Sequence, residues 1–136
     1  MNKAMCPDCG RERSDQGKIA LRITARCIDY LIDVPAIVCP CGLVICALDD
    51  LETVELAVVD QLLKRDQVDG DVLRWCRKSL GMTRCELALL LHSTEENICA
   101  FEAGVIPVPE EVRTALREHV TATRASRSWT PVVTVA

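Results

Sequence analysis

Two short cysteine clusters near the N-terminus constrain this 136-residue chain more than any other feature. The first reads Cys6-Pro7-Asp8-Cys9-Gly10, and the second reads Cys39-Pro40-Cys41-Gly42. In such a knuckle, a tight turn points two thiolates at one ion, and the glycine lets backbone N–H groups approach the sulfurs. Two knuckles together make a tetrahedral four-thiolate zinc site, which is a closed structural site rather than a catalytic one.

The second knuckle is one residue shorter than the first, which leaves its geometry less ideal. We predict one structural Zn²⁺ per chain, held by Cys6, Cys9, Cys39 and Cys41. Cys46 or Cys27 remains a possible substitute for Cys41 as the fourth ligand. The alternative to a metal site is a set of reduced cysteines that pack as small apolar side chains.

Composition limits the functional classes. The chain has nine cysteines, its N-terminus does not resemble a signal peptide, and no apolar run approaches the ~20 residues of a membrane span. These features predict a cytoplasmic, reducing compartment, where clustered cysteines more often bind metal than form disulfides. The net charge of −4 restricts any nucleic-acid contact to a local basic patch. Paired catalytic carboxylates, a Gly-rich phosphate loop and metalloprotease spacing are absent, so we do not expect an enzyme.

The N-terminal region reads as a small antiparallel sheet. Apolar and polar residues alternate over 19–25, and the alternation changes parity near Cys27, which predicts a turn there. Further strand segments lead into and out of the second knuckle. About 45 residues bury too little surface to be stable alone, so zinc would supply the difference.

The rest of the chain reads as helical. Asp49 or Asp50 is a candidate N-cap for a helix over 51–62, and 64–70 is a polar linker. Shorter helices follow over 73–80, from the capping box at Thr83 to Leu91, over 95–103 after Thr94, and over 110–119. We therefore predict an α+β fold with a zinc-clipped β domain over 1–66, an all-α domain over 67–128 and a tail over 129–136.

The β-prone tail from Trp129 to Ala136 has no obvious element of its own to join. It can add as a strand to a sheet edge, within a dimer or on another protein. Alternatively, it is a disordered terminus.

The helical segments resemble the phage-repressor (Xre-type) helix-turn-helix over about 45 residues. The resemblance rests on Leu73 to Thr83, Glu86-Leu87-Ala88, Phe101-Glu102-x-Gly104 and Pro109 to Arg113. The first knuckle, with Val34-Pro35-Ala36 before the second, resembles the YgiT-type zinc finger of MqsA-like antitoxins. This family implies a structural zinc domain that contacts a toxin and a C-terminal domain that dimerises on a palindromic operator.

The resemblance implies a set of DNA-binding residues on three helices. Arg77 and Lys78 are expected on the exposed side of the first helix, and Arg84 in the first turn of the second. The recognition helix would present Glu95, Glu96, Asn97 and Ala100 to double-stranded DNA. Glutamate can accept from cytosine N4 and asparagine can read adenine, but carboxylates near phosphates weaken binding.

Two functions therefore remain open from sequence. One is a zinc-containing transcriptional repressor of the antitoxin type, acting as a homodimer. The other is a protein-interaction adaptor that uses the same scaffold and does not bind DNA. The acidic recognition helix separates them.

Overall fold

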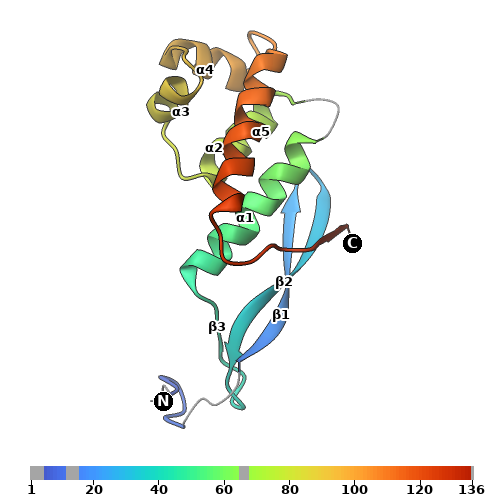
Figure 1. Ribbon diagram of the computed structural model, residues 1–136, viewed down its shortest axis with the longest axis vertical. Helices are drawn as coiled ribbons and strands as arrows, with labels where there is room; N and C mark the ends of the chain where they lie inside the picture. Colours follow the sequence, from blue (N-terminus) through green and yellow to red (C-terminus); the bar gives the residue numbers. More distant parts are fainter. Residues whose placement is uncertain (1–4, 12–15, 65–67, 136) are drawn as a thin grey trace.

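The computed structural model describes residues 5–11, 16–64 and 68–135. Its β-strands are β1 (Gln16–Ala25), β2 (Ile28–Val38), β3 (Val44–Ile45) and β4 (Val133–Val135). Its helices are α1 (Leu48–Leu63), α2 (Gly70–Ser79), α3 (Arg84–Leu90), α4 (Glu95–Glu102) and α5 (Glu110–Ala125). The sheet and the N-terminal knuckle form one end of the molecule, and α2 to α4 form the other (Figure 1). The fold is thus α+β with an antiparallel sheet.

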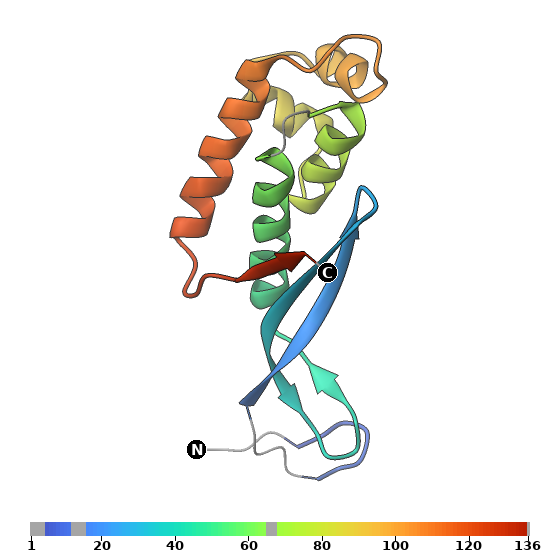
Figure 2. The same ribbon diagram turned by 90° about the vertical axis from the view of Figure 1, so that its right-hand side faces the viewer.

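β2 is the central strand of the sheet. It pairs antiparallel with β1 along its length, from Gln16↔Ile37 to Ala25↔Ile28. Its other edge pairs with β3 near the second knuckle and with β4 further along (Figure 2). The alternation changes parity near Cys27 because a two-residue turn, Arg26-Cys27, joins β1 to β2. Both residues have positive φ, at 54° and 65°, as in a type I′ turn. The twist of a type I′ turn matches the twist of the strands in a hairpin.

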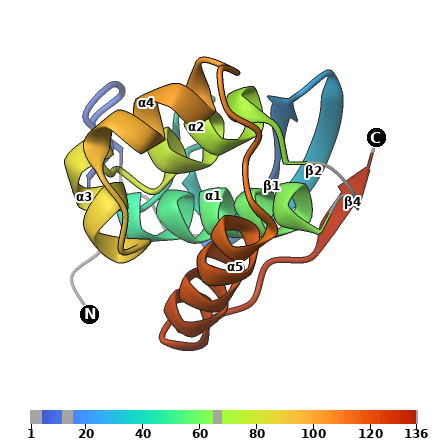
Figure 3. The same cartoon turned by 90° about the horizontal axis from the view of Figure 1, so that it is seen from above.

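The apolar face of the sheet packs on α1. Tyr30, Ile32 and Val34 of β2 are buried there, and α1 buries residues on nearly every side. Seen from above, α1 lies between α2 and α5 and contacts both (Figure 3). One continuous buried cluster therefore includes residues of the sheet and of all five described helices. The predicted domain boundary at 66/67 lies outside the described residues.

Several predicted helix ends need correction. α1 begins at Leu48 after Ala47, so neither Asp49 nor Asp50 is its N-cap; both lie in its first turn. Gly70 does not close a linker but begins α2, because Asp69 caps that helix by accepting from Val72 N–H. α5 runs beyond the predicted His119 to Ala125. The capping box at Thr83 and the N-cap at Thr94 are confirmed.

The C-terminal tail adds as a strand to a sheet edge, as one of the two alternatives drawn from sequence expected, but the edge belongs to its own chain rather than to a partner. β4 pairs with β2 through Ile32↔Val133, Leu31↔Thr134 and Tyr30↔Val135. The tail is also held by the Trp129 indole, whose Nε1–H donates to Asp50 Oδ1 at 2.8 Å. The tail thus crosses α1 and completes the sheet.

Candidate metal centre and the helical face

The two knuckles close with the same backbone hydrogen bonds despite their different lengths. In the first, Cys6 N–H donates to Arg11 and Gly10 N–H donates back to Cys6. In the second, Cys39 N–H donates to Leu43 and Gly42 N–H donates to Cys39. Gly10 and Gly42 have φ of 71° and 98°, a region that favours glycine. The second knuckle is therefore a tighter version of the same turn.

The four predicted metal ligands form one cluster. The sulfurs of Cys6, Cys9, Cys39 and Cys41 all lie within 4.8 Å of one another. The Cys6–Cys41 and Cys9–Cys39 sulfur pairs are 3.7 Å and 3.5 Å apart. Sulfurs bound at ~2.3 Å to a tetrahedral zinc lie about 3.8 Å apart, so the spacing fits such an ion. The cluster can hold a metal ion, and its all-thiolate donors suit soft or borderline metals.

The two substitute ligands lie elsewhere. Cys27 is in the β1–β2 turn, at the opposite end of the hairpin from Cys39. Cys46 follows β3 and packs half-buried against the apolar core. Within the described residues, neither belongs to the cysteine cluster. Cys41 therefore completes the set even though its knuckle is short.

The thiols of the cluster compete for ionisation. A hydrogen bond from Cys9 N–H lowers the pKa of Cys6 to about 6, despite the burial of that thiol. The N–H of Cys41 lowers the pKa of Cys39, but burial and the neighbouring thiols outweigh it and raise that pKa to about 12. One thiolate therefore makes the next harder to form. A cation removes this penalty because it allows all the thiols to ionise together.

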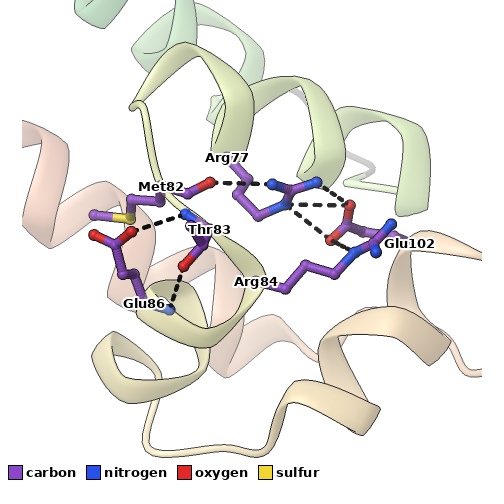
Figure 4. Close-up of polar contacts among 6 residues, drawn as sticks. All are labelled: Arg77, Met82, Thr83, Arg84, Glu86 and Glu102. Carbon is purple, nitrogen blue, oxygen red and sulfur yellow. Dashed lines mark hydrogen bonds and ion pairs between the residues drawn. The ribbon is translucent and has the colours of Figure 1, made fainter.

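Arg77 is not on the exposed side of α2 as predicted from sequence. Only 10% of its side chain is exposed, and its guanidinium makes a bidentate pair with Glu102, in which Nε and Nη2 donate to the two carboxylate oxygens at 3.1 Å and 3.0 Å. Nη1 donates to the carbonyl of Met82 at 3.0 Å (Figure 4). These contacts use its donors inside the protein. Lys78, the next residue, is exposed as expected.

Glu102 also lies near Arg84, the DNA-binding residue predicted in the first turn of the second helix. Its carboxylate is 3.6 Å from Arg84 Nε, and the Glu102 side chain is 3% exposed. Arg84 Nε is buried without a hydrogen-bond partner in the described structure, but 42% of the side chain remains exposed. One buried carboxylate at the end of α4 thus faces guanidinium groups from α2 and α3, which joins the three helices (Figure 4).

The predicted recognition helix presents an acidic N-terminus. Glu95, Glu96 and Asn97 are exposed on α4, whereas Ala100 is half-buried. The Asn97 amide donates to Ser93 Oγ at 3.2 Å, and its backbone N–H donates to Thr94. The exposed surface of the first turn therefore carries two carboxylates and one amide.

Sequence reasoning missed two contacts that fix α2. A Cβ added at Gly70 would lie 2.2 Å from the carbonyl oxygen of Phe101, so only glycine allows α2 to meet the end of α4 this closely. Arg26, in the hairpin turn, pairs with Asp69 at 2.6 Å and with Asp71 at 3.2 Å. Nothing in the local sequence predicts either contact, because the partners come from distant elements.

Comparisons with protein-family models, curated proteins and solved structures find no match to this chain. The described residues contain no helix with the length and apolar character needed to cross a membrane.

Proposed function

We propose that this chain is a zinc-containing transcriptional regulator, similar to antitoxin-type repressors, in which α3 and α4 form a helix-turn-helix. The observation that carries this proposal is the unit of two short, side-chain-capped helices separated by residues 91–94. The connecting turn passes through His92, whose φ is 53°. A connection of three or four residues between such helices is typical of the motif.

The buried carboxylate of Glu102 supports this unit. A recognition helix must hold a fixed angle to the helices behind it if its side chains are to reach base edges. Glu102 lies at the last turn of α4 and pairs with α2 through Arg77 and with α3 through Arg84. Arg77 then acts as a scaffold residue, and backbone contact falls to Lys78 and the exposed part of Arg84.

The cysteine cluster has a structural role in this proposal. The thiolates of Cys6, Cys9, Cys39 and Cys41 would bind Zn²⁺, which would hold the N-terminal knuckle against the end of the sheet. A closed four-thiolate site leaves no coordination position for a substrate. The metal would therefore stabilise the fold and would take no part in chemistry.

A salt-dependent gel-shift with DNA from the promoter of the protein's own gene tests this function. Each phosphate contact contributes about 0.9 to the slope of log affinity against log salt concentration. We expect Lys78→Ala with Arg84→Ala to lower that slope, whereas Arg11→Ala, at the exposed knuckle, leaves it unchanged. Absence of salt-sensitive binding by the parent protein at low salt would refute the proposal.

A protein-interaction adaptor is the second candidate, and the acidic first turn of α4 favours it. Glu95 and Glu96 are exposed where phosphates would approach, and Arg77 is withdrawn into the interior. The paired variant Glu95→Gln with Glu96→Gln separates the candidates. It should raise affinity for DNA if α4 approaches the duplex, and it should weaken a complex with a basic protein partner, such as a toxin, if α4 is an adaptor surface.

A further inference from the structure

The outer edge of β1 is the longest unpaired strand edge in the described structure. Within the described residues, β1 pairs only with β2, and no other element lies along its far side (Figure 2). It spans Gln16–Ala25 without proline, and its register with β2 runs continuously without a bulge. A long unpaired strand edge is a template for pairing with another chain.

The hairpin turn fixes which backbone groups point outward. In a hairpin with a two-residue turn, the pair that closes the turn is hydrogen bonded, and here that pair is Ala25↔Ile28. The odd-numbered residues of β1 therefore bond to β2. Pro35, which has no N–H, agrees with this assignment because it lies opposite Lys18 in a non-bonded pair. The free N–H and C=O groups belong to Lys18, Ala20, Arg22 and Thr24.

The two faces of β1 differ at this edge. Ile19, Leu21 and Ile23 lie on the face that packs on the core, and all three are only half-buried. Lys18 and Arg22 lie on the opposite face and are exposed. Charged side chains on an edge strand restrict pairing. Here Lys18 and Arg22 limit the registers that a second strand can adopt, and the apolar face of the edge carries no charge.

One antiparallel register makes this edge complementary to itself. With Leu21 opposite Leu21 of a second copy, Ile19 lies opposite Ile23. The half-buried apolar side chains of the two copies then form one continuous apolar surface across the paired edges. Lys18 then lies opposite Thr24, and Arg22 opposite Ala20. A shift by two residues in either direction places Lys18 opposite Arg22 or Arg22 opposite itself. Like charges directly opposite are destabilising, so the first register is favoured.

We propose that β1 is a dimer interface, in which two copies of this chain pair antiparallel about Leu21 and join their sheets across a two-fold axis. The outward N–H and C=O groups of Lys18, Ala20, Arg22 and Thr24 then bond between copies. This interface is separate from the C-terminal contact expected from sequence and does not depend on whether the chain binds DNA.

Ala20→Pro in the full-length zinc-loaded protein tests the proposal. The Ala20 N–H points away from β2, so proline there removes a donor needed only between copies, and edge strands tolerate such a proline. Ala20→Thr keeps the donor and is the matched control. Light scattering at tens of micromolar should give a dimer for the parent and for Ala20→Thr, and a monomer for Ala20→Pro. Zinc content and circular dichroism check that all three proteins fold.

Amide hydrogen exchange in the parent gives a second readout that requires no variant. The outward amides of Lys18, Ala20, Arg22 and Thr24 should exchange at least about tenfold more slowly at high than at low protein concentration. A dimer formed elsewhere leaves these amides unprotected at every concentration. A monomeric parent overturns the proposal, as does a dimer in which the outward amides exchange freely, whether or not Ala20→Pro folds.

Discussion

The cysteine end of the molecule and its helical end are held together by different means. The segment 5–11 buries only Cys6, and its two cysteine sulfurs lie 3.7 Å and 3.5 Å from sulfurs of the second knuckle. The helical end buries Leu73, Leu87, Ile98 and Leu116 completely and adds a buried ion pair. The first region therefore depends on what its thiols bind, whereas the second depends on apolar packing that the chain supplies itself. The two ends should respond differently to metal removal and to core substitutions.

The largest effect should come from Cys6→Ser. Loss of one thiolate should abolish tight zinc binding, and structural sites of this kind contribute on the order of 10–16 kcal/mol in apparent binding free energy. We expect metal analysis to show loss of zinc, and amide exchange to show loss of protection at Cys39, while α2–α5 keep their helical signal. Cys85→Ser, an exposed position on α3, is the control. Equal loss of order at both ends would contradict the inference that only the cysteine end depends on its thiols.

Glu102→Gln should give the next largest effect and should act on the helical end alone. The substitution leaves the Arg77 guanidinium buried without a counter-charge, which costs about 3–5 kcal/mol in the free energy of unfolding. Denaturant unfolding measures this loss, and zinc content should stay unchanged. Glu110→Gln is the matched control, because Glu110 is 75% exposed and lies 3.7 Å from Arg113. Its effect should be within about 0.5 kcal/mol.

Gly70→Ala tests the close approach of α2 to α4. The new Cβ would lie 2.2 Å from Phe101 O and 2.7 Å from Glu102 O, and both are backbone atoms that cannot move cheaply. We expect a loss of about 1–3 kcal/mol in unfolding free energy. At Gly17, an added Cβ meets nothing closer than 3.9 Å, so Gly17→Ala should leave stability nearly unchanged. Similar values for the two variants would show that α2 can shift without loss.

Glu55→Gln should give the smallest effect and acts on α1, which lies between the two ends. Partial burial, with repulsion from Glu52, raises the pKa of Glu55 in the folded protein. Ionisation of Glu55 therefore opposes folding at neutral pH, and this penalty disappears as pH falls below both its folded and unfolded pKa values. The variant should be more stable than the parent at pH 7, by no more than a few tenths of a kcal/mol after solvent screening. Glu118→Gln, on the exposed face of α5, serves as control, and an unchanged difference at low pH would contradict this origin.

The sequence predicted most of the local structure of both ends. The cysteine spacing identified the four clustered thiols, and the alternation over 19–25 identified β1 and its turn. Thr83 and Thr94 identified two helix starts, because their signals are bonds within a few residues. Predictions failed where a contact between distant residues determined the structure. Arg77 is buried because its partner, Glu102, comes from another helix.

What the sequence determined by itself was therefore the set of elements and the chemistry of the cysteine cluster. Turns, caps and metal-ligand spacings act over a few residues, and their signals can be read directly from the chain. Only the tertiary structure decided that the tail joins β2, that Arg77 faces inward and that the outer edge of β1 is left unpaired. These outcomes depend on which surfaces pack together after the elements have formed, and such contacts cannot be predicted from residues that are neighbours in the sequence.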